Sequence, residues 1–257
     1  MKKTAKKLSR TDILTPVSGR LADVIVYEQI GSTNTEARRM LAEGKPTPFL
    51  LAAMSQTAGR GRRGNTFFSP ESGLYMTLAL KPDEYKSAIA RTTIAAAVSL
   101  YEAILETTGI VCGIKWVNDL YYERKKIAGI LCEAPRGTSG QPLGILIGIG
   151  INVAQKEFPD ELKEKAGSLN RPDLDRNLLA SVLTKRLLYW CSHLNDPALI
   201  ASYKAHSILL GHTVSFQQNS KTITGTAEDI TDSGSLLVRT ADQLFELNSG
   251  EISLLSW

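Results

Sequence analysis

The chain has 257 residues, of which 43% are hydrophobic and 22% are charged, and its formal net charge is +4. This composition is typical of a globular protein with one large domain or two, and so mild a charge does not by itself indicate nucleic-acid binding, which needs a clustered basic face. Three widely spaced cysteines without a C-x-x-C pair disfavour a disulfide framework or a zinc site, and no apolar run approaches the ~20 residues that span a bilayer.

The N-terminus concentrates much of the positive charge. We expect residues 1–21 to form a basic, solvated tail, because lysine and arginine dominate its first ten positions. No apolar segment of a signal peptide follows. The residues concerned are Lys2, Lys3, Lys6, Lys7 and Arg10.

Hydrophobic periodicity predicts strands and helices in alternation up to about residue 210. Ser32, Thr33 or Asn34 can cap the first helix, and Gly44 can end it. The polar segment 118–126 is interpreted as a tight turn that joins two strands into a hairpin. Strands are expected over residues 22–30, 47–56, 74–81, 109–116, 127–134 and 142–153, and helices over 35–43, 86–109, 173–194 and 196–204.

The texture of the sequence changes from Thr213 onwards. Short alternating segments are separated by Asn-Ser, Asp-Ser-Gly and Ala-Asp, which is the spacing of a small all-β barrel. We therefore place a domain boundary near Gly211. The predicted units are the tail at 1–21, a large domain of mixed strands and helices at 22–210 and a small β domain at 211–257.

The segment Gly59–Gly64 reads G-R-G-R-R-G and formally matches the dinucleotide-binding pattern G-x-G-x-x-G. That motif needs a helix after the glycines, whereas Phe67, Phe68 and Pro70 follow here and lead into another strand. A Walker A loop is excluded because its lysine is missing. We expect a mobile cationic loop that an anion orders by pairing with the guanidinium groups. Taken alone, a solvated basic turn or an RG-type contact to nucleic acid explains the loop equally well.

Three further segments carry polar residues or glycines near expected strand ends. They are K-W-V-N-D-L at 115–120, R-K-K-I-A-G-I-L at 124–131 and G-I-G-I-N-V at 148–153. The hairpin turn is expected to bring Asp119 near Lys126. Individually these residues have ordinary explanations, such as an exposed hairpin lysine, a turn aspartate and a strand-end cap.

Together and in this order, the segments resemble the biotin–protein ligases, or biotin–[acetyl-CoA-carboxylase] synthetases. The matching pieces are S-T-N before a helix, Q-x-x-G-R-G-R-R-G, K-W-x-N-D, K-x-x-G-I-L, G-x-G-I-N-V and G-E-I-S-L at 250–254. The resemblance runs from about residue 24 to the end. It implies an α+β fold, with a mixed β-sheet catalytic domain that has helices packed on one side, and a small C-terminal SH3-like β-barrel.

The resemblance also implies a two-step reaction. Biotin and MgATP give biotinyl-5′-adenylate and pyrophosphate, and the biotinyl group then passes to one lysine of a biotin carboxyl carrier protein. ATP with Mg²⁺ is the expected co-substrate, with no resident metal site and no redox cofactor. A cytoplasmic location fits the reduced thiols. Neither a nucleic acid nor a membrane is an expected partner, and a homodimer is left open.

Because the biotin carboxylate is itself the nucleophile, positioning and charge stabilisation are the enzyme's main tasks. The resemblance implies that Lys126 and Arg62 are catalytic and that Asp119 is a metal-side or proton-accepting group. The implied biotin-binding residues are Ser32, Thr33, Asn34, Gln56, Gly59, Arg60, Gly61, Arg62, Phe67, Lys126, Gly129, Leu131 and Gly148. The implied nucleotide-binding residues are Arg62, Asn118, Lys126 and Asn152.

Two alternatives stay open at this point. A lipoate or octanoate ligase shares the fold, although the polar set Ser32, Thr33 and Gln56 matches a ureido ring better than a lipoyl ring. A nucleic-acid-binding module would use the basic tail and the arginine loop, but leaves the other segments unexplained. Some relatives carry a winged helix-turn-helix before the ligase. Since about 31 residues precede Ser32, fewer than the ~60 such a fold needs, we expect no operator binding.

Overall fold

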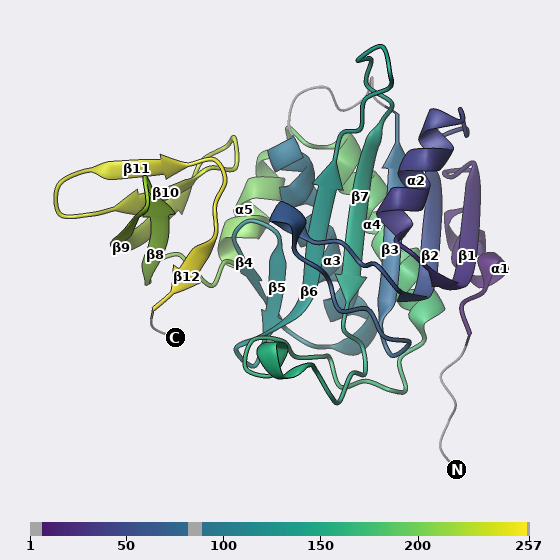
Figure 1. The fold of residues 1–257 in the computed structure, drawn as a ribbon, viewed down its shortest axis with the longest axis horizontal. Coiled ribbons are helices and arrows are strands. Elements are labelled where there is room, and N and C mark those ends of the chain that lie inside the picture. The colour runs from purple at the N-terminus through teal and green to yellow at the C-terminus, as the bar shows by residue number, and fades with distance from the viewer. Residues whose placement is uncertain (1–6, 82–88, 256–257) are drawn as a thin grey trace.

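The computed structural model describes residues 7–81 and 89–255, which form two units built on two separate β-sheets (Figure 1). The strands of the larger sheet are β1 (Asp23–Ile30), β2 (Phe49–Gln56), β3 (Leu74–Leu80), β4 (Gly113–Lys115), β5 (Asp119–Tyr122), β6 (Lys125–Glu133) and β7 (Ile145–Ile151). The helices are α1 (Arg10–Leu14), α2 (Thr33–Ala42), α3 (Ile89–Thr108), α4 (Arg176–Ser192) and α5 (Pro197–Ala205), with short 3₁₀ turns η1 (Thr15–Val17), η2 (Arg62–Gly64) and η3 (Asp160–Leu162). The smaller sheet contains β8 (Thr213–Gln218), β9 (Lys221–Ile230), β10 (Leu236–Arg239), β11 (Leu244–Leu247) and β12 (Ile252–Leu254).

The larger sheet is mixed, as the resemblance implied. Its strand order is β1-β2-β3-β7-β6-β5-β4, with β1 parallel to β2 and the other neighbours antiparallel. The smaller sheet is antiparallel throughout, in the order β11-β10-β9-β8-β12. The α+β fold class with a separate C-terminal β unit is confirmed.

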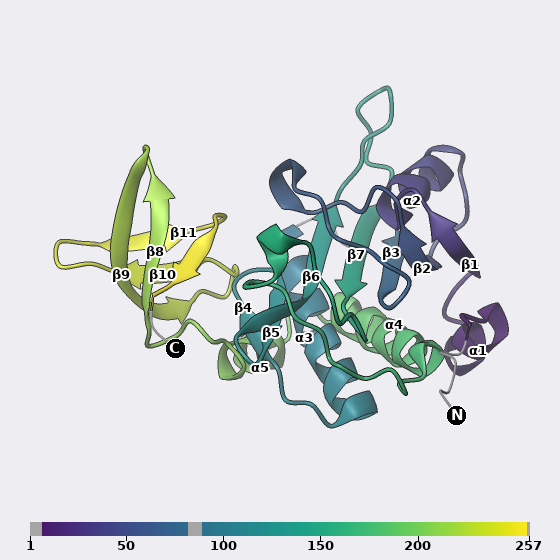
Figure 2. The ribbon, with the colours of Figure 1, turned by 60° about the horizontal axis from the view of Figure 1, so that its bottom comes forward.

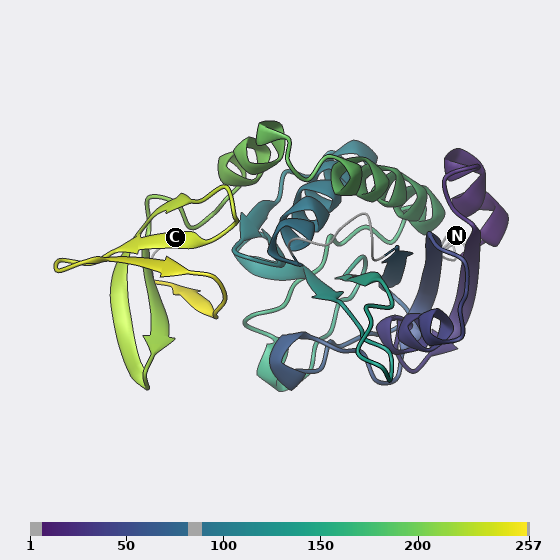
Figure 3. The ribbon, with the colours of Figure 1, turned by 90° about the horizontal axis from the view of Figure 1, so that it is seen from above.

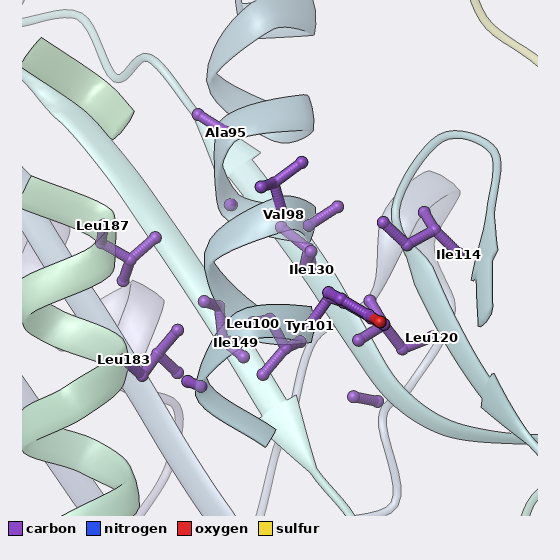
Figure 4. Packing of buried hydrophobic residues seen from close by; sticks show 14 of the residues in the cluster. Ala95, Val98, Leu100, Tyr101, Ile114, Leu120, Ile130, Ile149, Leu183 and Leu187 are labelled. Atoms are coloured by element: carbon purple, nitrogen blue, oxygen red, sulfur yellow. The ribbon is translucent and has the colours of Figure 1, made fainter. Parts of the chain in front are cut away.

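The main hydrophobic core lies between the larger sheet and the helices α3 and α4. In β7 the sequence I-L-I-G-I-G-I has an isoleucine at every second position, and successive side chains of a strand point to opposite sides. All isoleucines of β7 therefore point to this face. Figure 4 shows Ile149 of β7 and Ile130 of β6 behind Val98 and Leu100 of α3, with Leu183 and Leu187 of α4 beside them. The helix-covered face is therefore filled with branched apolar side chains.

Helix α2 packs on the other face of the same sheet. Ala37 and Leu41 of this helix contact a smaller apolar cluster that includes Phe49, Leu51 and Leu146. Seen from above, α2 lies on one side of the sheet, and α3 and α4 lie on the other (Figure 3). The helices are thus less one-sided than the resemblance implied, since α3 and α4 share one face and α2 covers part of the second.

Two local predictions are wrong. Residues 118–126 are not a turn, because β5 forms a strand that pairs with both β4 and β6 and so satisfies its backbone hydrogen bonds on both sides. The N-terminal segment is not a solvated tail from residue 8 to residue 17, because Leu8, Ile13 and Val17 are buried and α1 packs on α4. Lys2, Lys3 and Lys6 lie outside the described residues, as do the first three residues of the predicted helix 86–109.

The C-terminal unit lies beside the β4 and α5 side of the larger unit (Figure 2). Trp116 donates its indole N–H to the Gly234 carbonyl at 2.9 Å, and Lys204 forms an ion pair with Asp229 at 2.7 Å. The predicted boundary near Gly211 falls between α5 and β8. Among the described helices, none is both long enough and apolar enough to cross a bilayer.

The connection from α5 to β8 also covers the outer edge of the larger sheet. The backbone of Ile114 in β4 accepts a hydrogen bond from the Ile208 N–H and donates one to the His206 carbonyl. A parallel bridge joins Ile114 to Ser207 between them. The three residues 206–208 therefore act as a short eighth strand on the open side of β4.

Candidate active site

A small cavity of about 50 Å³ lies over β6 and β7, where the arginine loop, defined as Gly59–Gly64, comes close to the start of α2. The cavity gathers residues from segments that are far apart in the sequence. They are Ser32, Thr33, Asn34, Gln56, Arg60, Gly61, Arg62, Phe67, Asn118, Lys126, Gly129, Ile130, Leu131, Gly148, Ile149 and Gly150.

Glycines of β6 and β7 make the floor of the cavity. Gly129 is paired with Gly150 across the two strands, and the Phe67 ring lies directly on this pair. A Cβ atom added at Gly150 would lie 2.5 Å from the ring, and one added at Gly129 would lie 3.1 Å from it. Any larger residue at either position would therefore displace Phe67 or fill the cavity.

The polar wall of the cavity begins at the first turn of α2. Ser32 is the N-cap of this helix, and its hydroxyl accepts from the Thr35 N–H, as expected for a capping serine. Gln56, the last residue of β2, accepts from the Thr33 N–H through Oε1 at 2.8 Å. Asn34 donates to the Leu131 carbonyl at 3.2 Å. The predicted polar residues thus share one wall.

The arginine loop folds back on itself above the floor. An antiparallel bridge joins Arg60 to Thr66, and the Gly61 N–H donates to the Asn65 carbonyl at 2.7 Å. Arg63 is in the left-handed region with φ of 56°. Arg60 and Arg62 point to different partners, because Arg60 pairs with Glu133 and Arg62 donates to Asn118 Oδ1 at 2.9 Å. The three like charges are therefore spread apart, and the mobility expected of the loop stays a prediction.

Lys126 and Asp119 meet as predicted. The Lys126 ammonium lies 2.7 Å from Asp119 Oδ1, with the two side chains 31% and 22% exposed. The contact is made across two neighbouring strands, since β5 pairs with the start of β6. The same ammonium lies 5.9 Å from the centre of the Phe67 ring. The Lys126 cation thus lies near the Phe67 ring that covers the glycine floor of the cavity.

Hydrogen bonds with β6 and α5 hold the turn between β4 and β5 in place. Asn118 donates its side-chain amide to the Ile130 carbonyl at 3.0 Å, and the Ile130 N–H donates to the Asn118 carbonyl at 2.9 Å. Tyr203 of α5 donates its hydroxyl to the Val117 carbonyl at 3.2 Å, and burial raises the pKa of this tyrosine. These bonds leave Asn118 Oδ1 facing Arg62. Nearby, burial lowers the pKa of Lys115, which lies 5.3 Å from the Tyr121 ring centre.

Three predicted site residues do not line the cavity. Gly59 lies behind the wall, where an added Cβ would be 2.4 Å from the Phe67 carbonyl. Asp119 contacts the cavity only through Lys126. Asn152 is turned away, because its amide donates to the Gly167 carbonyl at 2.8 Å and its oxygen accepts from Gln155 at 3.2 Å. The remaining predicted residues all line it.

Sequence reasoning missed two polar residues around the cavity. Thr77 of β3 is fully buried and its hydroxyl lies 2.6 Å from Asn34 Oδ1. Glu133, the last residue of β6, accepts hydrogen bonds from Arg38, Arg60 and Asn34. Neither residue belongs to a recognisable motif, and only the alternation of β6 and the pairing of β3 with β7 would have indicated the face on which they lie.

Comparisons with known proteins agree with this arrangement. The family described as "Biotin/lipoate A/B protein ligase family" matches residues 26–152, and "Biotin protein ligase C terminal domain" matches residues 209–255. The chain is 32% identical to the bifunctional ligase/repressor BirA of Bacillus subtilis (strain 168), covering 96% of this chain and 79% of that protein. It is 30% identical to the biotin–[acetyl-CoA-carboxylase] ligase of Paracoccus denitrificans, covering 81% of this chain and 90% of that protein.

Among solved structures, the biotin protein ligase from Aquifex aeolicus in complex with biotin and ATP is similar to this chain with a TM-score of 0.75. The two are 30% identical, and the alignment covers 91% of this chain and 98% of that one. The likeness includes both units of the fold, because so little of either chain is left outside it.

Proposed function

The chain belongs to the biotin/lipoate A/B protein ligase family, and from this premise we propose that it activates biotin with ATP and transfers it to a lysine of a biotin carboxyl carrier protein. The relatives named as biotin–[acetyl-CoA-carboxylase] ligases support the acceptor class. The similar structure that contains biotin and ATP supports the two small substrates.

One observation carries the proposal: two cations, Lys126 and Arg62, line a cavity whose floor is glycine and whose wall is polar. The reaction joins a carboxylate to an α-phosphate, so two anions have to approach each other. An ammonium and a guanidinium at the meeting point lower the cost of that approach and stabilise the charge that develops during attack. Holding both substrates in one orientation contributes the rest of the rate.

Each residue of the site has a proposed part in this reaction. Lys126 contacts the biotin carboxylate and the α-phosphate, and Asp119 holds its ammonium in place through the 2.7 Å ion pair. Arg62, supported by Asn118, faces the nucleotide. Phe67 forms the aromatic side of the biotin slot. The nucleotide contact implied for Asn152 has no support in its position, since its side chain is used within the fold.

The polar wall suits the head of biotin better than that of lipoate. A ureido ring offers two N–H donors and one C=O acceptor, and hydroxyl and amide groups can match both kinds. Ser32, Thr33 and Gln56 supply those groups, whereas a lipoyl ring has no N–H or C=O group to pair with them.

Magnesium enters the proposal together with ATP. This ion is commonly held by one or two carboxylates and by substrate phosphates, so a single acidic residue near the cations is sufficient. Asp119 is the carboxylate that the chain offers beside Lys126. The three cysteines are free thiols, which fits a reducing compartment such as the cytoplasm.

The test is ATP–pyrophosphate exchange with purified protein. We expect exchange that depends on biotin and Mg²⁺, followed by biotin transfer to an isolated carboxyl carrier domain. Exchange that responds to lipoate or octanoate and not to biotin would contradict the proposal and favour the lipoate branch of the same family.

A further inference from the structure

We propose that Glu133 is a positioning residue, which holds the arginine loop over the cavity through Arg60 and ties that loop to the polar wall through Asn34. The role in binding rests on the proposed function, whereas the role in holding the loop does not. Glu133 ends β6, and its side chain is only 15% exposed.

The carboxylate of Glu133 accepts hydrogen bonds from three residues on two separate segments, the arginine loop and α2. Arg60 of the arginine loop donates through Nη1 to Oε2 and through Nη2 to Oε1, both at 3.1 Å. Arg38 of α2 donates to Oε1 at 2.7 Å, and Asn34 donates to Oε2 at 2.9 Å. A two-pronged guanidinium–carboxylate contact fixes orientation as well as distance, so it can set where the loop lies.

The hydrogen bonds that lead away from Glu133 run through Asn34 and Thr77 to Thr33. The Asn34 Nδ2 group faces two acceptors, Glu133 and the Leu131 carbonyl, so its Oδ1 must accept from the Thr77 hydroxyl at 2.6 Å. Thr77 has a single hydroxyl proton. The Thr77 hydroxyl also lies 2.8 Å from the Thr33 hydroxyl, which donates to Gln56 Oε1 at 3.2 Å.

The same chain of bonds continues to the far end of the loop. Gln56 accepts from the Thr33 N–H through Oε1, and its Nε2 donates to Ser69 Oγ at 3.1 Å. Ser69 then donates to the Phe67 carbonyl at 2.8 Å. Arg60 before the turn and Phe67 after it are thus connected through the residues that form the polar wall. A ligand on that wall would therefore contact residues that are hydrogen-bonded toward both sides of the loop.

The contact with Glu133 also gives Arg60 and Arg62 different roles. Arg60 is committed to a carboxylate inside the protein, so its charge is compensated. Arg62 has only the neutral amide of Asn118 as its described hydrogen-bond partner and keeps its charge for an incoming anion. The geometry therefore points to Arg60 as the residue that anchors the loop and Arg62 as the one that meets the ligand.

The first experiment measures hydrogen–deuterium exchange of the ligand-free protein over residues 59–67. Glu133→Gln keeps the size of the side chain and removes its charge. We expect faster exchange in the loop of this variant, with exchange in α3 and α4 unchanged. Arg60→Gln should give the same result from the other side of the contact, and Arg38→Ala, which removes the α2 partner of the same carboxylate, should leave loop exchange as in the wild type.

Loop exchange that is unchanged in both Glu133→Gln and Arg60→Gln would overturn the proposal, and so would equal effects of Arg38→Ala and Glu133→Gln. In the Arg38→Ala background, where no arginine of α2 faces position 133, the charge-reversed pair Glu133→Arg with Arg60→Glu should restore slow exchange if the contact itself matters. A structural role of Glu133 alone would not be rescued in this way.

Calorimetry with biotin then tests the link to binding. We expect about a tenfold weaker biotin affinity in Glu133→Gln, which corresponds to about 1.4 kcal/mol, while the adenylation rate at saturating biotin stays close to that of the wild type. Wild-type protein that fails to bind biotin would overturn the proposed function and leave the exchange experiment to decide the role in the loop. Normal biotin affinity in Glu133→Gln would overturn only the further inference.

Discussion

The two faces of β7 show how one strand serves two purposes. On one face Ile145, Ile147 and Ile151 belong to the main hydrophobic core beneath the helices. On the other face Gly148 and Gly150 have no side chains, and Asn34 and the Phe67 ring lie against their backbones. The alternation that places isoleucines in the core therefore places the two glycines, which leave room for a ligand, on the cavity face. We therefore expect substitutions on the core face of β7 to change stability and substitutions on its cavity face to change substrate binding.

The largest effect is expected where two neighbouring lysines point in different directions. Lys126 lines the cavity, whereas Lys125 donates to the Lys163 carbonyl at 2.7 Å. Removal of a group that stabilises transition-state charge typically costs up to ~10³-fold in rate. We expect Lys126→Ala to lower single-turnover adenylation by about that factor and Lys125→Ala to react at close to the wild-type rate. Equal rates for the two variants would break the comparison.

Substitutions on the helix-covered face of β7 should lower the free energy of unfolding. Ile147 is fully buried, and Ile147→Ala removes three carbons from a packed core, so it should destabilise the fold by about 3 kcal/mol. Urea unfolding measures this, and Ile147→Val should cost about 1 kcal/mol. We expect the folded fraction of Ile147→Ala to bind biotin as the wild type does. Weaker binding without loss of stability would show that the faces are not separate.

Substitutions on the cavity face of β7 should lower the affinity for biotin. A Cβ at Gly150 would lie 2.5 Å from the Phe67 ring, so Gly150→Ala must push the ring off the floor. We expect biotin affinity to fall about tenfold, or about 1.4 kcal/mol, with an unfolding free energy near that of the wild type. Gly31→Ala is the matched control, because nothing lies within 4 Å of an added Cβ there. Calorimetry that finds identical affinities for both variants would contradict the steric argument.

The smallest effect concerns the chemistry of two neighbouring positions on β6. Burial raises the pKa of the Cys132 thiol to about 12, so at pH 8 it carries almost no reactive thiolate. We expect iodoacetamide to modify Cys132 slowly in the native protein and quickly in urea. Leu131 lines the cavity, and Leu131→Cys should react faster, with biotin slowing the reaction. Peptide mass spectrometry identifies the modified position, and rapid native labelling of Cys132 would contradict the raised pKa of its partly buried thiol.

Much of the site could be predicted because its residues lie in short, ordered segments. Ser32 before a helix-forming run identifies an N-cap. The G-I-G-I of β7 identifies a strand with one bulky and one empty face. Lys126 and Asp119 could be brought together because a hairpin connection limits how far apart they can lie.

The errors and omissions have a common physical origin in tertiary contacts. Strand β5 is polar enough to read as a turn, and only pairing on both edges makes it a strand. The charges around α1 suggest solvent exposure, yet Ile13 is fully buried. Glu133 and Thr77 reach the polar wall from strands that are distant in sequence, and no local pattern reports the distance between them.

The three residues 206–208 that run along β4 have a consequence for synthesis of the chain. An unpaired edge strand is a template for pairing with other molecules, and domains fold from the N-terminus while translation continues. Ile114 leaves the ribosome long before His206 and Ile208, which later form hydrogen bonds with its backbone N–H and carbonyl. Until then the nascent sheet has an open flank. A chain cut short before residue 206 keeps that flank open permanently, so such fragments should self-associate more readily than the intact chain.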